Sequence, residues 1–343
     1  MNTKLMKAQV HLTHFCNLKC IFCNVPANAR GKRDLSEKKW LEINNDLCDL
    51  HPEIVTISGG GEPLLRKNLI RKMLKLFYFN EIKTELITNG TLVAGPLAKE
   101  IVEYVECLRV SIHSLSPILD RLLRGVYGSL NKSIKGIKEV AAWKEKLKRD
   151  KPTIDVVMVI TTYNIMEIEK MIKKARKLGV NKISLRITHK YGEKYKPNSA
   201  QFKYLQKKMK YFENLAKKEK IILNQDFLPE IFGIEENNEK NVWHEKNFPL
   251  CSIPFREIVV FADGRVAPCC NFIDVPEAVL PVESVKNKKL KDIWFGRKFN
   301  ELRESMLKRK EKIPKICREC SIDLKPIDKR YKEYYEDDNR KII

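Results

Sequence analysis

The segment Thr13-His14-Phe15-Cys16-Asn17-Leu18-Lys19-Cys20-Ile21-Phe22-Cys23 places three cysteines in a C-x3-C-x2-C pattern. It follows an apolar stretch, Ala8 to Leu12, that is typical of a first β-strand. Three thiolates at this spacing can hold three irons of a 4Fe–4S cube and leave the fourth iron open for a ligand. Structural metal sites normally close their coordination instead. The segment therefore predicts a cluster with chemistry at the open iron, carried on the loop after the first strand.

A zinc site is the alternative for this triplet. Zinc motifs usually pair two C-x2-C elements, and a three-residue gap is less usual among them. The spacing therefore favours iron–sulfur over zinc.

The length and the cysteine count indicate how many domains to expect and which cellular compartment. With 343 residues it can bury a full core, and we expect one large domain and a smaller one. The cysteine triplet begins close to the N-terminus, so no signal peptide is expected, and no apolar run approaches the roughly 20 residues that span a bilayer. Ten cysteines without a secretory signal indicate a reducing, cytoplasmic location.

The charge balance favours an anionic ligand. Lysine and arginine total 66 against 44 acidic residues, a net charge of +22. The lysines are spread over nearly every predicted helix, and no nucleic-acid-binding motif is recognisable. We therefore expect no nucleic-acid or membrane partner, whereas a substrate that carries phosphate or carboxylate fits the charge.

Short β-rich runs alternate with amphipathic helical patterns up to about residue 190. In the first helical pattern, Trp40, Ile43, Leu47 and Leu50 recur on one face of a 3.6-residue helix. Six such units predict a parallel sheet with right-handed crossovers. Six are too few for a closed eight-stranded barrel, so the fold class is α/β with an open, partial (β/α)6 barrel. The predicted strands are Gln9–Thr13, Ile54–Ser58, Lys83–Thr88, Cys107–His113, Ile154–Thr161 and Lys182–Ile187.

Chemistry-bearing residues follow the ends of these strands. In parallel barrels the active site lies at the carboxyl ends of the strands. The second strand leads into Ser58–Pro63, the third into Thr88–Gly90, and the fourth ends at Ser111-Ile112-His113. These segments and the cysteine loop are therefore predicted to meet at one mouth.

A second cysteine group lies near the C-terminus. An apolar run from Glu257 to Phe261, an Asp263-Gly264 turn and a second short run predict a β-hairpin, followed by a helix over 290–308. We therefore expect two domains, a barrel over residues 1–235 and a small hairpin-and-helix domain over residues 236–343.

Together these segments resemble the radical S-adenosylmethionine (SAM) superfamily. The cysteine triplet and Gly59-Gly60-Gly61-Glu62-Pro63 match two motifs of that family. The spacing Cys251-x12-Gly264-x4-Cys269 resembles the opening of the SPASM domain, and Cys317-x2-Cys320 completes four thiolates, as in the shortened "twitch" form of that domain. The resemblance covers nearly the whole chain.

The resemblance implies SAM and two 4Fe–4S clusters as cofactors. It implies that Gly60, Gly61 and Glu62 lie at the SAM amino group, Phe22 beside the adenine and Ser111 near the ribose. The implied ligands of the SAM-binding cluster are Cys16, Cys20 and Cys23, and those of the auxiliary cluster are Cys251, Cys269, Cys317 and Cys320.

Four further residues are candidates from their positions alone. Asn89 and Arg186 lie at strand ends and are predicted contacts of SAM or substrate. His113 is a candidate catalytic residue, although a lone histidine is more often structural. Cys270 is left over beside Cys269; it replaces Cys269 as a ligand, donates a hydrogen atom to a substrate radical, or packs.

The predicted function is therefore that of a radical SAM enzyme. It would cleave SAM to a 5′-deoxyadenosyl radical and abstract a hydrogen atom, with the auxiliary cluster as an electron relay. Its substrate would be a peptide or a small polar, sugar-like or anionic molecule, and its electron donor a reductase, a flavodoxin or a ferredoxin. A redox-neutral epimerase with a cysteine hydrogen donor is the alternative, and a zinc-ribbon protein that binds nucleic acid is the alternative of a different class.

Overall fold

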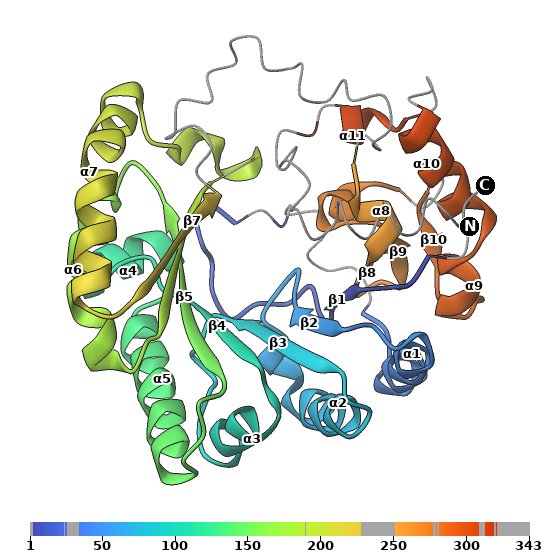
Figure 1. Cartoon of the computed structure of the whole chain (residues 1–343), viewed down its shortest axis with the longest axis horizontal. Helices are drawn as coiled ribbons and strands as arrows, with labels where there is room; N and C mark the ends of the chain where they lie inside the picture. Colours follow the sequence, from blue (N-terminus) through green and yellow to red (C-terminus); the bar gives the residue numbers. More distant parts are fainter. Residues whose placement is uncertain are drawn as a thin grey trace.

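One sheet of ten strands organises the part of the chain that the computed structural model describes, which comprises residues 3–23, 25, 34–188, 190–227, 251–276, 279, 281–308, 313–318 and 320 (Figure 1). The strand order is β10-β9-β8-β1-β2-β3-β4-β5-β6-β7. The strands are β1 (Lys7–His11), β2 (Ile54–Ser58), β3 (Lys83–Thr88), β4 (Cys107–Ser111), β5 (Thr153–Ile160), β6 (Lys182–Ile187), β7 (Ile222–Phe227), β8 (Glu257–Val260), β9 (Arg265–Ala267) and β10 (Glu283–Ser284).

Helices cover one face of this sheet, and the strands curve into an open arc (Figure 1). Strands β1 to β7 are parallel and lie in chain order, which is the result of right-handed βα units. The sheet is not closed, so the predicted open barrel is confirmed. The helices of the barrel are α1 (Glu37–Leu50), α2 (Lys67–Phe79), α3 (Pro96–Tyr104), α4 (Pro117–Arg124), α5 (Ser129–Lys146), α6 (Ile168–Ala175) and α7 (Ser199–Lys218). Short 3-10 helices are η2 (Pro63–Arg66), η3 (Ile165–Glu167), η4 (Arg176–Leu178) and η5 (Lys190–Tyr195).

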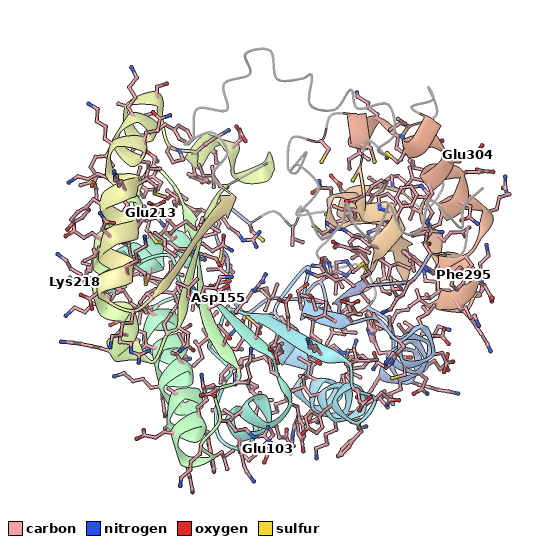
Figure 2. All side chains as sticks on the ribbon, in the orientation of Figure 1. Glu103, Asp155, Glu213, Lys218, Phe295 and Glu304 are labelled. Carbon is pink, nitrogen blue, oxygen red and sulfur yellow. The ribbon has the colours of Figure 1, made fainter. Side chains whose placement is uncertain are left out.

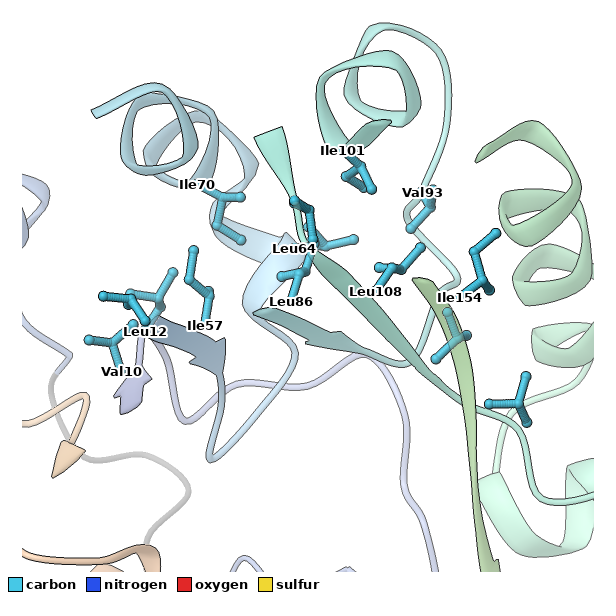
Figure 3. Packing of buried hydrophobic residues seen from close by; sticks show 14 of the residues in the cluster. Val10, Leu12, Ile57, Leu64, Ile70, Leu86, Val93, Ile101, Leu108 and Ile154 are labelled. Carbon is cyan, nitrogen blue, oxygen red and sulfur yellow. The ribbon is translucent and has the colours of Figure 1, made fainter. Parts of the chain in front are cut away.

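The main hydrophobic core lies between the strands and these helices. Strand residues such as Val10, Ile57 and Leu86 pack against Ile70 of α2 and Ile101 of α3 (Figure 3). Burial of this apolar surface is the main stabilising contribution to the barrel.

The opposite, inner face of the sheet is polar. Glu85 of β3 accepts hydrogen bonds from Thr56 Oγ1 (2.9 Å) and from the Arg109 guanidinium (3.1 Å). Asp155 of β5, labelled in Figure 2, accepts from Ser184 Oγ (2.9 Å) and lies 3.6 Å from Nε of Arg109. Because successive strand residues point to opposite faces, these buried charges line the interior of the arc.

The barrel contains a seventh strand beyond the six that the sequence predicts. Helix α7 packs on α6 and leads into β7, which pairs with β6. The sequence does not predict the segment Ile-Leu-Asn-Gln-Asp-Phe of β7, because three consecutive polar residues interrupt the apolar pattern of this edge strand.

The predicted C-terminal hairpin is present, and it extends the barrel sheet. Strand β8 pairs in parallel with β1, β9 pairs antiparallel with β8, and β10 with β9. Gly264 takes φ +90° in the turn. The predicted boundary between residues 235 and 236 lies outside the described residues.

Short helices complete the C-terminal part. The helix predicted over 290–308 is divided near Gly296, where an added Cβ would lie 2.4 Å from the backbone oxygen of Asp292. Trp294 Nε1 donates to the Thr3 oxygen (2.8 Å), and Asp46 Oδ2 of α1 accepts from the backbone N–H of Leu290 (2.8 Å). These bonds fix the C-terminal part to the barrel. The helices are α8 (Ile253–Arg256), η8 (Cys270–Asp274), α9 (Leu290–Trp294), α10 (Arg297–Lys308) and α11 (Lys315–Arg318).

Within the described ranges, no helix has both the length and the apolar character that a membrane crossing requires.

Candidate cluster and cofactor sites

The three cysteines of the triplet share one short loop after β1. Cys16 is exposed, and Cys20 and Cys23 are partly buried. The backbone N–H of Leu18 donates to Cys16 Sγ (3.4 Å). Burial, reinforced by the neighbouring Cys23, raises the pKa of the Cys20 thiol to about 12. Such a thiol becomes a thiolate only beside a bound cation, so the loop fits the predicted iron cluster.

The end of α4 supports this loop. The backbone N–H groups of Lys19 and Ile21 donate to the backbone oxygens of Arg124 and Leu123, both at 3.0 Å. Gly125 closes α4 at φ +72°, and a Cβ there would lie 2.7 Å from the Lys19 oxygen. Only glycine combines this backbone conformation with so close an approach.

The glycine segment after β2 is bonded to the cysteine loop. The N–H of Gly61 donates to the Thr13 oxygen (2.9 Å), and that of Glu62 to the Phe15 oxygen (2.8 Å). A Cβ on Gly61 would lie 1.9 Å from the Phe15 oxygen. Packing within the protein therefore requires glycine at residue 61.

Gly60 differs from Gly61 because it has room around it. A Cβ on Gly60 would make ordinary contacts, with His14 Cδ2 at 3.4 Å and Ile273 Cδ1 at 3.6 Å. Protein packing therefore does not explain this glycine. A backbone without Cβ allows a ligand to approach closely, which fits the predicted SAM contact.

The Glu62 carboxylate is buried, 2% exposed, and accepts three hydrogen bonds. The donors are the backbone N–H groups of Leu64 (3.1 Å) and Asn89 (2.8 Å) and the Thr88 hydroxyl (2.6 Å). Burial raises the pKa of this carboxyl. Glu62 thereby ties the glycine segment to the end of β3, and its contact with the SAM amino group stays a prediction.

Asn89 connects the end of β3 to the cysteine loop. Its Nδ2 donates to Asn17 Oδ1 (2.7 Å), and its Oδ1 accepts from the N–H (2.9 Å) and the hydroxyl (2.7 Å) of Thr91. The side chain is therefore engaged within the protein, and its predicted contact with SAM or substrate stays a prediction.

Phe22 and His113 lie against each other, with ring centroids 4.7 Å apart in an edge-to-face arrangement. His113 Nδ1 accepts from the backbone N–H of Val159 (3.1 Å), so the ring proton is on Nε2. Burial, with a smaller effect of Arg124, lowers the pKa of His113 to about 3. His113 is therefore a neutral ring held between Phe22 and the backbone of β5. A catalytic role for it stays a prediction.

Arg186 and Cys270 bring the barrel and the C-terminal part to the same mouth. Ser111 and Arg186, at the ends of β4 and β6, are partly buried. Cys270 is exposed, yet protein surrounds it on most sides. This desolvation, aided by Glu257, raises the pKa of the Cys270 thiol, and Arg186 opposes the effect. Arg186 is therefore within electrostatic reach of Cys270.

Three of the C-terminal cysteines pack near one another: Cys269 and Cys317 lie against one buried apolar cluster, and Cys251 and Cys317 against a second. Cys251 and Cys320 both contribute to the pKa of the Cys317 thiol, which burial chiefly raises to about 12. Burial also raises the pKa of Cys269, and the adjacent Cys270, followed by Cys317 and Cys251, adds to this effect. Cys270 is influenced by groups of the barrel and β8. Cys269 is therefore within electrostatic reach of Cys317 and Cys251, which favours it over Cys270 as a ligand.

Among the residues that the structure describes, no three His, Cys, Asp or Glu side chains are gathered to hold one metal ion.

Two histidines at the end of β1 were not singled out from the sequence. The backbone N–H and Nδ1 of His14 lie 3.1 and 3.0 Å from Asp34 Oδ1. His11 is buried with its ring edge-to-face on Phe261 (5.2 Å), and burial lowers its pKa to about 3. No local pattern signals these contacts, because the partners are distant in sequence.

Comparison with known proteins agrees with this arrangement. The family model of the Radical SAM superfamily matches residues 10–175, and that of the SPASM iron–sulfur cluster-binding domain matches residues 251–321. A probable GTP 3′,8-cyclase of Sulfurisphaera tokodaii is 29% identical over 185 residues, which cover 54% of this chain and 56% of that protein. One of Saccharolobus islandicus is 26% identical over 184 residues, covering 54% and 57%. The matched part spans little more than half the length of these relatives.

Solved structures share the fold. Streptococcus suis SuiB bound to S-adenosylmethionine superposes with a TM-score of 0.68 at 18% identity, covering 92% of this chain and 77% of that one. Native anSMEcpe with bound AdoMet gives a TM-score of 0.63 at 17% identity, covering 98% of both chains. The chain therefore belongs to the radical SAM superfamily and carries a C-terminal SPASM domain, an enzyme whose cofactors are S-adenosylmethionine and two 4Fe–4S clusters.

Proposed function

We propose that this enzyme abstracts a hydrogen atom from a polar substrate and passes one electron of the resulting substrate radical to its auxiliary cluster. When bound, the N-terminal cluster and SAM supply a 5′-deoxyadenosyl radical as the abstracting group. Removal of a hydrogen atom and then of an electron and a proton amounts to a two-electron oxidation of the substrate. The electron that starts the reaction comes from an external donor, for which we propose a reductase, a flavodoxin or a ferredoxin.

The position of the auxiliary segment is the observation that carries this proposal. Strand β8 pairs directly with β1, which precedes the cysteine triplet. Ile273, three residues after Cys270, lies near Gly60 of the predicted SAM segment, since a Cβ on Gly60 would be 3.6 Å from its Cδ1. A cluster held beside this segment would lie close to the proposed reaction site, as an electron relay requires.

The residues of the chain take the following proposed roles. Gly60 and Gly61 allow the methionine end of SAM to approach the backbone, Phe22 packs beside the adenine, and Ser111 lies near the ribose. Cys16, Cys20 and Cys23 hold the first cluster, and Cys251, Cys269, Cys317 and Cys320 hold the auxiliary one.

For the substrate we propose a peptide or a sugar-like molecule that carries a carboxylate or a phosphate. Arg186 at the mouth and the net charge of +22 support an anionic group. Among proteins with similar sequence or fold, the Sulfurisphaera tokodaii relative is named a probable GTP 3′,8-cyclase, and SuiB has been crystallised with the precursor peptide SuiA. Both substrates are polar and multiply functionalised.

Anaerobic reconstitution tests the proposal. Iron and sulfide are counted, the protein is reduced with SAM present, and 5′-deoxyadenosine is measured. We expect about eight irons per chain and accumulation of 5′-deoxyadenosine. Zinc in place of iron, with intact SAM, would overturn the mechanism in favour of a zinc-ribbon protein.

Redox-neutral epimerisation is the second candidate, because the Cys270 thiol is exposed and within electrostatic reach of Arg186. In this reaction the thiol would return a hydrogen atom to the substrate radical. Turnover in D2O separates the two: an epimerase incorporates solvent deuterium into its product and loses this incorporation in C270A. An oxidised product that forms equally in C270A excludes the thiol donor.

A further inference from the structure

A buried ion pair lies directly beneath the N-terminal cysteine loop. Asp120 and Arg124 are one turn apart in α4, with side chains 2% and 0% exposed and Arg124 Nη1 3.4 Å from Asp120 Oδ1. The sequence gives no sign of this burial, because both are charged residues on a short helix.

Hydrogen bonds connect this pair to the cysteine loop and to the end of β3. Arg124 Nη2 donates to the Asn89 oxygen (2.9 Å) and to Ser133 Oγ (3.0 Å), and the backbone oxygen of Arg124 accepts from Lys19 in the cysteine loop (3.0 Å). Asn89 in turn bonds to the Glu62 carboxylate. A movement of Arg124 would therefore displace the cysteine loop and the end of β3 together.

The pair also lies next to the cluster loop in space, because the residue that donates to the Arg124 oxygen is Lys19, directly before Cys20. Salt screens charges that are removed from solvent much less than surface charges. The pair is thus a fixed dipole beside the cysteine loop.

We propose that Asp120 and Arg124 set the reduction potential of the N-terminal cluster. Net charge and hydrogen bonding around an iron–sulfur cluster tune its potential. Reduction adds one negative charge to the cluster, so the Arg124 guanidinium stabilises the reduced form and the Asp120 carboxylate stabilises the oxidised form. Arg124 thus positions the cysteine loop and also shifts the redox equilibrium of the cluster toward its reduced form. This inference rests on the proposed function only in that the N-terminal cluster receives the first electron.

Charge-changing variants of nearly equal shape test the two signs separately. Asp120→Asn removes the anion, and we expect the midpoint potential of the N-terminal cluster to become less negative. Arg124→Met removes the cation and is expected to make the potential more negative. Arg124→Lys keeps the charge but loses the guanidinium hydrogen bonds to Asn89 and Ser133. The potential of the N-terminal cluster should therefore stay near that of the unmodified protein. Each is measured on the reconstituted holoenzyme by EPR-monitored redox titration.

Two internal controls accompany the titration. The auxiliary cluster should keep its potential in every variant, and Glu100→Gln should leave both potentials unchanged, because Glu100 pairs with Arg71 on the outer helices α2 and α3. If Arg124→Met fails to bind iron, Asp120→Asn and Arg124→Lys still decide the matter. An unchanged or more negative potential in Asp120→Asn overturns the inference.

The titration is independent of turnover. A shift of the predicted sign with no formation of 5′-deoxyadenosine would support the inference and contradict the proposed function. Normal formation of 5′-deoxyadenosine with no shift in Asp120→Asn would do the reverse.

Discussion

Gly60 of the segment after β2 and Ile273 of the C-terminal part lie close together, because a Cβ on Gly60 would be 3.6 Å from Ile273 Cδ1. The first residue belongs to the predicted SAM motif, and the second follows the auxiliary cysteine pair. A ligand that passes over Gly60 therefore meets both parts of the protein. The predicted SAM segment and the segment after the auxiliary cysteines therefore lie at the same end of the barrel, although more than 200 residues separate Gly60 from Ile273 in the sequence.

Alanine substitutions at the two neighbouring glycines should have opposite consequences. Gly61→Ala forces a Cβ to 1.9 Å from the Phe15 oxygen, and we expect it to destabilise the protein by about 3 kcal/mol. Gly60→Ala fits the protein and should leave the unfolding midpoint unchanged. It should nevertheless weaken SAM binding by about tenfold, equivalent to about 1.4 kcal/mol.

Thermal unfolding and isothermal titration with SAM, both under anaerobic conditions, measure the two effects. Each glycine variant serves as the control for the other. Unchanged SAM affinity in Gly60→Ala would contradict a ligand contact at this residue.

Adjacent cysteines should differ in iron content. Cys269→Ala should lose the auxiliary cluster and retain about four irons per chain, whereas Cys270→Ala should keep about eight. The reason is that Cys269 is influenced by Cys317 and Cys251, and Cys270 by Arg186 and Glu257. Iron and sulfide analysis after identical reconstitution gives the answer. The reverse pattern would assign the ligand to Cys270.

The buried His113 should make stability depend on pH. Its pKa in the folded protein is about 3, below the ordinary value of 6.5. Only the unfolded chain binds the proton between these values, so stability is full above pH 6.5 and is lost as the pH falls toward 3. Relative to His113→Asn, which does not titrate, the unmodified protein should lose about 2 kcal/mol between pH 7 and pH 5.

Urea unfolding of both proteins at the two pH values tests this dependence. An equal change in the two proteins would show that His113 is accessible to protons in the folded state.

The polar interior of the arc should contribute more to stability than surface ion pairs. Glu85→Ala removes one of two carboxylate partners of Arg109 and the partner of Thr56, and we expect a loss of about 2 kcal/mol because a partly buried guanidinium loses a charged hydrogen-bond acceptor. Glu53→Ala, which breaks an exposed pair with Lys4, should cost less than about 1 kcal/mol. Similar losses for both variants in urea unfolding would mean that solvent screens the interior pair.

Local patterns allowed the sequence to predict much of the fold. Three features could be predicted from adjacent residues alone. They are the strand before the cysteine triplet, the glycine segment and the hairpin at Asp263-Gly264. Confirmed parts therefore include the parallel order of the first six strands, the open barrel and the C-terminal hairpin.

Arrangements that depend on distant residues could not be read in this way. The edge strand β7 lacks an apolar alternation, since three consecutive polar residues stand in its middle. The pairing of β8 with β1 joins backbone groups whose hydrogen bonds carry no side-chain signature. The contact of His14 with Asp34 likewise depends on how the chain returns to the cysteine loop.

The sequence by itself determined which chemistry the chain can hold, because cysteine spacing and glycine positions are properties of short segments. The tertiary structure alone decided what surrounds that chemistry. It buried Asp120 and Arg124 beneath the cysteine loop, brought Cys269 within electrostatic reach of Cys317 and Cys251 and Cys270 within that of Arg186, and placed Gly60 near Ile273. The physical reason is that burial and electrostatic reach are functions of distance in space, which a linear sequence does not contain.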